Sequence, residues 1–306
     1  MLVPYLPNLK SLLSDYRTVK NICYGLIRIL VLVAQIGEQS IRSILLSGIL
    51  NNIDDVIMYH ISHKSLILNI FTLFHELSTV PEGANYLATH NFFSVSIKVI
   101  QRFLKDLPLN SEESAETVEK VLSTIQFVIE KQPSTMRSFL ETSGYSVILS
   151  VCTSEMVSRG VRRAALNCLM LLLQNDLGDE QLRSLNLISR LLQSETDVSW
   201  VIPIWFCCRY TIQYHSGLVT MDELMLIEES AVQCIAKSIE DRNLMNAVVQ
   251  TIFVCATCPG LVSNLWTQSK LRPAGSGTPR SFDSLLALSG KETESRSLYG
   301  GDASRW

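Results

Sequence analysis

The sequence carries little charge and almost no excess of either sign. Charged residues make up 18% of the 306 residues, the formal net charge is −3 and the isoelectric point is near 6.0. Proteins that hold nucleic acid through a general electrostatic field have a clear excess of Lys and Arg. Binding of DNA or RNA by the whole surface is therefore not indicated, and only local basic patches remain to be weighed.

Long apolar runs and secretion signals are also missing. The most apolar run, Ile22 to Ile36, is shorter than a membrane-spanning helix and contains Arg28 and Gln35. The N-terminus lacks the basic segment of a signal peptide, and the sequence holds no N-x-Ser/Thr glycosylation site. The eight cysteines follow no regular disulfide spacing and mostly lie in apolar runs. We therefore expect reduced thiols, no membrane partner and an intracellular location, cytoplasmic or nuclear.

Catalytic and cofactor signatures are absent as well. Gly275-Ser-Gly277 lacks the third glycine and the preceding strand of a dinucleotide loop, and Gly290-Lys291 has no phosphate-loop glycine before it. The G-x-S-x-G turn of α/β-hydrolases does not occur. The sequence therefore predicts a protein that is not an enzyme and takes no cofactor.

Two short motifs have the spacing of metal or redox sites, but each lacks a required partner. Cys255-Ala-Thr-Cys258 lies at the C-terminal end of an apolar helical run, whereas a redox pair needs a helix N-terminus and zinc needs a second pair. His60-x-x-His63 has no acidic or thiolate third ligand nearby. We favour core packing for the cysteines and surface or internally bonded positions for the histidines, and we predict no metal site.

The strongest positive signal is the helical spacing of apolar residues. It runs through Leu66 to Leu77 and returns in Phe92 to Leu104. Between these segments Pro81 and Gly83 end the first helix and leave room only for a short helix at Asn85 to Thr89. The first helix is apolar over so much of its circumference that it must be covered on several sides, as in a stack of helices.

The same pattern predicts helices in the rest of the chain. Pro203 should kink or break the aromatic segment Trp200 to Tyr210. Thr220 and Glu223 form a capping box that opens a helix reaching to about Ile239. The other predicted helices are Val118 to Ile129, Met136 to Thr142, Tyr145 to Cys152, Val161 to Asn175 and Leu244 to Cys258.

In each predicted unit a second helix, such as Phe92 to Leu104, returns after the turn. The positions at which these returning helices are entered recur at intervals of 43, 43, 53 and 42 residues. The acidic and polar loop Leu107 to Glu116 accounts for the longer third interval. A period of this length is typical of armadillo and HEAT arrays. An ordinary helical bundle whose spacings agree by accident is the alternative. The positions compared are Leu6, Ile49, Phe92, Tyr145 and Leu187.

The composition changes past Trp266. Leu271 to Trp306 is rich in Gly, Ser, Pro and Arg and cannot bury enough apolar surface to fold. We therefore expect an armadillo-like helical repeat domain over residues 1–266 and a disordered tail over residues 267–306. Ser281 to Gly290 is a short apolar island in this tail, for which leftover sequence is favoured over a docking motif.

The amino-acid sequences of several segments resemble the repeats of the armadillo family. Leu6 to Leu30 has a short helix ending in a leucine pair, an SD turn, a basic residue and a long apolar helix, and the segments NFFSVSIKVI and SGYSVILSV are similar to the entry of such repeats. The resemblance covers Leu6 to Trp266. It implies an all-α, armadillo/HEAT-like superhelical solenoid of about five irregular repeats that acts as a protein-interaction scaffold. Because no polar capping helix precedes the first repeat, we favour a shortened form or fragment of a longer solenoid.

The segment FHELSTVPEGANYLATHNFF also resembles a family of armadillo-like vertebrate proteins of meiosis. That resemblance implies a nuclear, germ-cell role in meiotic double-strand break formation and chromosome synapsis, through protein partners. Two other functions stay open. One is a generic cytosolic adaptor for a helical or folded partner, and the other is a nucleic-acid-associated solenoid whose binding would depend on salt.

Candidate binding residues follow partly from the family. Armadillo relatives that hold extended peptides carry an Asn near the end of each long helix, and the matching positions sixteen residues before the entry positions are Val33, Glu76, Ile129 and Leu171. Only Glu76 is polar, which favours a surface for a helix or folded partner over a peptide ladder. The basic residues lie in two groups without interleaved aromatics, and solvated faces are favoured there over an acidic partner. The candidate binding residues are Glu76, Lys98, Arg102, Lys105, Arg162, Arg163 and Asn167.

Overall fold

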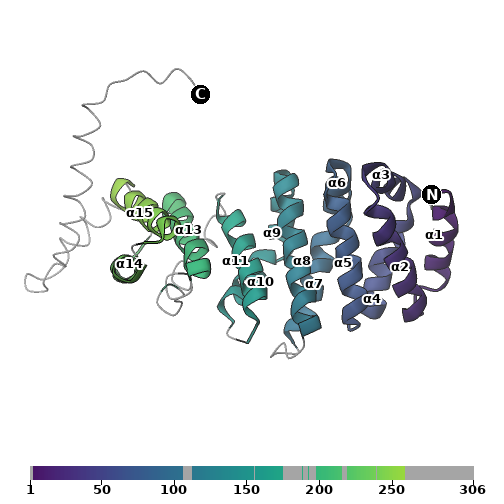
Figure 1. Cartoon of the computed structure of the whole chain (residues 1–306), viewed down its shortest axis with the longest axis horizontal. Helices are drawn as coiled ribbons and strands as arrows, with labels where there is room; N and C mark the ends of the chain where they lie inside the picture. Colours follow the sequence, from purple (N-terminus) through teal and green to yellow (C-terminus); the bar gives the residue numbers. More distant parts are fainter. Residues whose placement is uncertain are drawn as a thin grey trace, which may run out of the picture. The chain divides into compact units, whose positions relative to one another are not determined.

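Every regular element in the described part of the chain is a helix, so the all-α prediction is confirmed (Figure 1). The computed structural model describes residues 3–105, 112–154, 156–174, 188, 192, 198–215, 219–238 and 240–258. These residues fall into two compact units, Met1–Leu172 and Leu173–Trp306. The expected tail at 267–306, its apolar island, position Leu187 and residues 107–111 of the acidic loop lie outside the described residues.

The first unit opens with η1 (Val3–Tyr5), α1 (Leu6–Asp15) and α2 (Lys20–Ala34). From there the chain passes three times through a short helix, a second helix and a long helix. The first passage is α3 (Glu38–Ser47), η2 (Ile49–Asn52) with α4 (Ile53–His60), and α5 (Lys64–Ser78). The second is α6 (Pro81–Thr89), α7 (Phe92–Leu104) and α8 (Glu112–Lys131). The third is η3 (Pro133–Thr135) with α9 (Met136–Glu141), α10 (Gly144–Thr153) and α11 (Arg159–Leu173).

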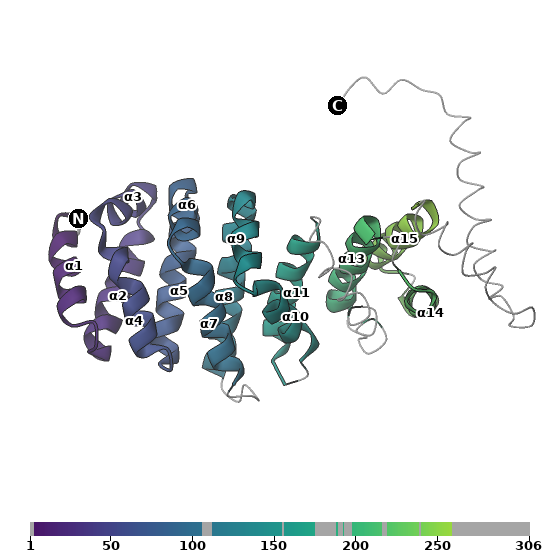
Figure 2. The ribbon, with the colours of Figure 1, turned by 180° about the vertical axis from the view of Figure 1, so that it is seen from behind.

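The long helices pack against one another in chain order. Helix α5 contacts both α2 and α8, and Figures 1 and 2 both show α2, α5, α8 and α11 side by side. Buried polar side chains reach from one long helix to the backbone of the one before it. The Thr124 hydroxyl lies 3.4 Å from the carbonyl oxygen of Phe71, and the Cys168 thiol lies 3.2 Å from that of Leu122. These contacts fix the depth at which each helix sits on its neighbour.

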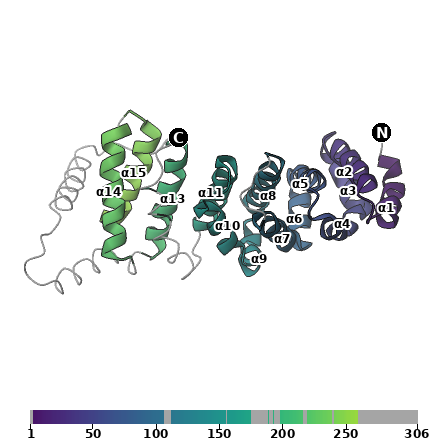
Figure 3. The ribbon, with the colours of Figure 1, turned by 90° about the horizontal axis from the view of Figure 1, so that it is seen from below.

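Helices α4, α7 and α10 form the other side of this unit, as Figure 3 shows from below. Five phenylalanines join α7 to the long helix α5 and to α9 through ring centroids 5.3 to 6.2 Å apart, mostly edge to face. Such pairs stabilise a core by more than their buried area alone. The rings are Phe71 and Phe74 of α5, Phe92 and Phe93 of α7, and Phe139 of α9.

The returning helices are entered through residues in the left-handed region. The backbone φ angle is +68° at Gly48, +53° at Asn91 and +62° at Ser143. Gly and Asn tolerate this conformation best, and a left-handed residue lets the chain reverse sharply between two helices. These three residues lie one or two positions before the predicted entry positions Ile49, Phe92 and Tyr145, so a sharp reversal of the chain precedes each of these three entries.

The second unit contains α13 (Val198–His215), α14 (Met221–Ser238) and α15 (Arg242–Thr257), with α15 packed on both other helices. The predicted capping box is present, since the Thr220 backbone amide and hydroxyl both lie 2.9 Å from the Glu223 carboxylate. Pro203 does not break its helix, since α13 runs through it, so that part of the prediction was wrong. Pro203 lies in the second turn, where one backbone hydrogen bond is lost, and the buried neighbours Ile204 and Trp205 keep the helix packed.

Candidate functional site

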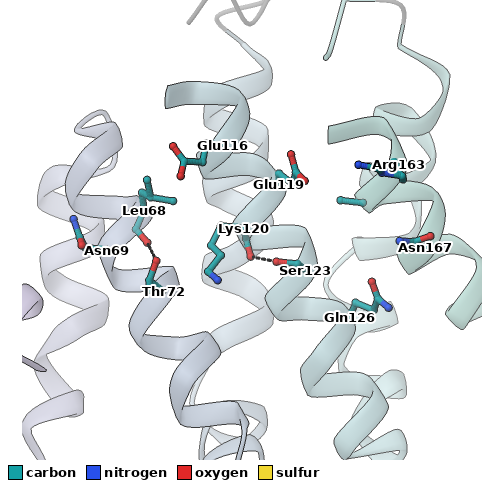
Figure 4. A pocket seen from close by; sticks show the side chains of 11 residues that line it. Leu68, Asn69, Thr72, Glu116, Glu119, Lys120, Ser123, Gln126, Arg163 and Asn167 are labelled. Atoms are coloured by element: carbon teal, nitrogen blue, oxygen red, sulfur yellow. Dashed lines mark hydrogen bonds between the residues drawn. The ribbon is translucent and has the colours of Figure 1, made fainter. Parts of the chain in front are cut away.

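A hollow of about 570 Å³ opens on the side of the first unit that the long helices form. It spans α5, α8 and α11 (Figure 4). Its volume falls within the range of roughly 300–1,000 Å³ that is usual for ligand sites. We call it the polar hollow, and it is lined by Leu68, Asn69, Thr72, Glu116, Glu119, Lys120, Ser123, Gln126, Arg163, Ala164 and Asn167.

Helix α8 supplies most of the polar lining because its sequence separates two faces. Val118, Val121, Leu122 and Ile125 are fully buried and hold the helix on its neighbours. Glu119, Lys120 and Ser123, which lie between them in the sequence, are only half-buried and face the hollow. An amphipathic helix in the middle of a stack therefore presents a row of hydrogen-bonding groups to the hollow.

Four charged side chains meet at the polar hollow without pairing. Glu116 and Glu119 carry negative charge, and Lys120 and Arg163 carry positive charge. No ion pair joins any of the four to another charged side chain in the described part of the protein. Glu119 and Lys120 are half-buried, and Glu116 and Arg163 are exposed. Charges that are held apart in this way keep their water and stay available to a ligand.

The neutral polar groups of the hollow differ in how far they are engaged. The hydroxyls of Thr72 and Ser123 donate to carbonyl oxygens of their own helices, at 2.8 and 2.9 Å. The amide nitrogen of Asn69 donates to the Ser65 carbonyl oxygen at 2.7 Å, which leaves its side-chain oxygen as an acceptor. The Asn167 side chain has no hydrogen bond to any described residue. Asn69 and Asn167 thus offer amide groups at opposite sides of the hollow (Figure 4).

His75 lies close behind the hollow on α5. Its ring packs 5.2 Å from that of Phe127, and its Nδ1 atom is buried without a hydrogen-bond partner among the described residues. Burial and the nearby positive charge of Lys120 lower the pKa of His75, and the Glu76 carboxylate acts in the opposite direction. His75 is therefore neutral near pH 7 and adds no charge to the hollow.

Two of the seven candidate residues from the sequence line the polar hollow, namely Arg163 and Asn167. Arg162 precedes them on α11 without lining it. Glu76 of α5 lies outside it as well and accepts a hydrogen bond from the Gln35 amide at 3.3 Å.

The other three candidates belong to α7 and its C-terminus, on the opposite side of the unit (Figure 3). Lys98 and Lys105 are exposed there, and Arg102 lies 3.5 Å from the hydroxyl of Ser62. The two basic groups are therefore not brought together in one surface.

The positions found by counting sixteen residues back from the entry positions do not coincide with the residues that line the polar hollow. Val33 and Ile129 are 0% and 2% exposed, so two of the four positions are core residues. The residues that this count missed share one signal, which is a polar position that interrupts the apolar face of a long helix. They are Asn69, Thr72, Glu116, Glu119, Lys120, Ser123 and Gln126.

The two metal-like motifs occupy the positions that their structural interpretation predicts. Cys255 is buried, and burial raises the pKa of its thiol to about 12. His60 is buried too, with Nε2 2.9 Å from the carbonyl oxygen of Arg17. Over the described ranges, no three His, Cys, Asp or Glu side chains are grouped so that they could hold a metal ion. Nor does any described helix combine the length and apolar character needed to cross a membrane.

Comparison of the sequence with protein-family models found no match, and comparison with curated proteins found none either.

Proposed function

We propose that this protein is a non-enzymatic interaction scaffold whose polar hollow binds a segment of a partner protein. The observation that carries the proposal is the set of four unpaired charges over a hollow that extends across three helices. A segment with side chains of both signs matches this lining, because it could pair with the carboxylates of Glu116 and Glu119 and with the cations of Lys120 and Arg163. Asn69 and Asn167 would bond its backbone or polar side chains.

We further propose that the helices form a solenoid of armadillo or HEAT type. Polar contacts between neighbouring layers support a period near forty residues, since they join side chains 38 to 41 positions apart. In the first unit these pairs are Arg17–Asp55, Gln35–Glu76, Arg42–Glu82 and Arg102–Ser62, and in the second the pair is Arg209–Gln250. Two other side-chain pairs, Asn51–Tyr86 and Gln174–Tyr210, lie 35 and 36 positions apart. Surface contacts of this kind add little stability, but separations of this size support the proposed repeat.

A stack of this kind suits a docking role for a physical reason. Each long helix is held by buried neighbours on two sides, so the groups that line the hollow are already positioned before a partner arrives. The conformational entropy lost on binding then comes mainly from the partner segment and only to a small extent from the scaffold. A hollow with both signs of charge also selects its partner by rejecting segments of uniform charge.

A site-specific cross-link tests the proposal. A photo-activated amino acid replaces Gln126, which lines the polar hollow, and in the control protein it replaces Gln101, which is exposed on α7. We expect position 126 to cross-link to a defined segment of a partner protein that position 101 does not reach. Charge reversal by Glu119→Lys or Arg163→Glu should lower this yield. The same products from both positions, nucleic acid as the product at 126, or a yield that charge reversal leaves unchanged would overturn the proposal.

The resemblance of residues 74–93 supports a more specific role. This segment, which contains α6, resembles the armadillo-like vertebrate protein called meiosis inhibitor protein 1. We propose on this basis a nuclear role in germ cells, in forming meiotic double-strand breaks and pairing homologous chromosomes through protein partners. Germ cells that lack the protein should then show fewer break-repair foci and incomplete synapsis. Normal foci and synapsis would leave the scaffold as a generic adaptor.

A further inference from the structure

A second, smaller hollow of about 260 Å³ lies between η2, α4, α5, α6 and α7 of the first unit. It shares no residue with the polar hollow. We call it the Asp54 pocket. Its lining residues are Leu50, Asn51, Asp54, Phe74, Tyr86, Leu87, Thr89, His90, Asn91 and Phe92.

Asp54 is the acidic residue in the lining of this pocket. Among the described residues it forms neither an ion pair nor a side-chain hydrogen bond. The adjacent Asp55, in contrast, is paired with Arg17 at 3.2 Å. The charges of His90 and Lys98 are near enough to act on the pKa of Asp54, yet burial and the charge of Asp55 dominate and raise it. The carboxylate is thus half-buried, and it has no ion-pair partner among the described residues although it lies in the first turn of α4.

One wall of the pocket is aromatic and fixed. The rings of Tyr86 and His90 are stacked, with centroids 3.9 Å apart and planes 12° from parallel. The Tyr86 hydroxyl donates to the Asn51 side-chain oxygen at 2.9 Å, and the His90 Nδ1 atom lies 2.8 Å from the Tyr86 carbonyl oxygen. Both rings are therefore held in place, and because they stack face to face each keeps one open face for a further planar group.

Part of the pocket lining is apolar, beside the polar residues already described. Leu50, Phe74, Leu87 and Phe92 are all buried core residues that line it. The pocket therefore combines apolar contact surface, a stacked pair of rings and one carboxylate without an ion-pair partner among the described residues. Its volume is below the range of roughly 300–1,000 Å³ for drug-sized ligands, so it suits a single long side chain better than a complete small molecule.

We propose that the Asp54 pocket binds the side chain of an arginine presented by a partner protein. A guanidinium group pairs with a carboxylate through two parallel hydrogen bonds and stacks on aromatic faces, which a lysine ammonium group does less well. The methylene stem of arginine packs against apolar residues such as Leu50 and Leu87. Asp54 supplies the charge, Tyr86 with His90 the stacking wall, and the buried residues the contact for the stem.

The inference extends the scaffold role, because it names one side chain that a partner would carry. It does not depend on the polar hollow. Cross-linking at Gln126 reports on the polar hollow alone, whereas the experiment below uses an isolated arginine derivative. A negative result for the polar hollow therefore does not contradict the Asp54 pocket, and a negative result for the Asp54 pocket does not contradict the polar hollow.

The test is a titration of the isotope-labelled full chain with Nα-acetyl-arginine amide, followed by NMR. The matched ligand is Nα-acetyl-citrulline amide, which has the same shape without the charge. We expect the arginine ligand to shift the Tyr86 and His90 signals and the citrulline ligand to leave them unchanged. Asp54→Asn should weaken binding by at least about tenfold, as expected for loss of a hydrogen-bonded charge.

The control variant is Asp55→Asn, which removes the neighbouring carboxylate that Arg17 already occupies and should bind the arginine ligand. Thermal unfolding of both variants checks that they fold. Equal shifts with the citrulline ligand, shifts confined to residues outside the pocket, no binding at all, or full binding by Asp54→Asn would each overturn the inference.

Discussion

The Glu119 carboxylate of α8 lies against the α-carbon of Gly160 in α11, in the space that a side chain at position 160 would fill. A methyl group added at Gly160 would overlap Oε2 of Glu119. Because the obstacle is the end of a flexible side chain, Gly160→Ala should keep the fold and cost less than about 1 kcal/mol. The Glu119 carboxylate must then move, so we expect cross-linking from position 126 in the polar hollow to fall. In a Glu119→Ala background the Gly160 substitution should have no further effect.

Gly83 of α6 meets a harder obstacle than Gly160. A β-carbon there would overlap the backbone carbonyl group of Leu77, which α5 holds in place. Gly83→Ala should therefore destabilise the protein by about 1–3 kcal/mol or more, the usual cost of overpacking a core. Gly25 of α2 is the matched control, since nothing lies within 4 Å of a β-carbon at that position. Gly25→Ala should stabilise the helix by about 0.5–1 kcal/mol. Thermal unfolding of the two variants measures whether each is less or more stable than the unchanged protein. Equal changes in stability would contradict the close approach of α6 to α5.

Most helix positions could be predicted from the sequence because apolar spacing and helix-ending residues act locally. Phe92–Leu104 forms as predicted. The short helix predicted at Asn85 to Thr89 was placed too late, because α6 begins at Pro81, where proline suits the first position of a helix. Pro203 was misjudged because the packing of Ile204 and Trp205 decides its effect, and that packing involves a distant helix. Apolar spacing and helix-ending residues predict where a helix forms, and tertiary contacts decide whether the helix tolerates a residue such as proline.

The candidate site was harder to predict for a geometric reason. A count of sixteen residues reaches the same place near the C-terminal end of α5 (Lys64–Ser78) and of α8 (Glu112–Lys131), but the two helices turn different positions to the core there. The same count therefore reaches a half-exposed position at Glu76 and a core position at Ile129. Arg163 and Asn167 were found because they lie on the solvent face of α11. Glu119 and Lys120 were missed because only the packing of three helices shows that they share a hollow with these residues.

The depressed pKa of His75 makes its titration a probe of the region behind the polar hollow. Since burial and the Lys120 charge both oppose protonation, the ring should titrate below the usual value of 6.5. As the pH falls below 6.5, the unfolded chain takes up a proton at His75 that the folded chain does not, so the free energy of unfolding decreases. His75→Gln should remove this part of the pH dependence. In Lys120→Met the midpoint, followed by NMR of the His75 ring, should move up towards 6.5, and an unchanged midpoint would contradict the proximity of the two residues.

The raised pKa of Asp54 gives a prediction of the opposite sign. Its folded-state pKa lies above the unfolded value near 3.8, so the folded chain holds the proton more tightly. Stability linked to this proton is present below pH 3.8 and is lost as the pH rises through the folded-state pKa, and at pH 7 the ionised carboxylate opposes folding. Asp54→Asn should therefore raise the melting temperature at pH 7 and leave it nearly unchanged at pH 3. A residue that costs stability in the free protein while it faces a pocket is the pattern expected when a ligand supplies the missing charge. A lower melting temperature for Asp54→Asn at pH 7 would instead make Asp54 a structural residue and remove that support for the pocket.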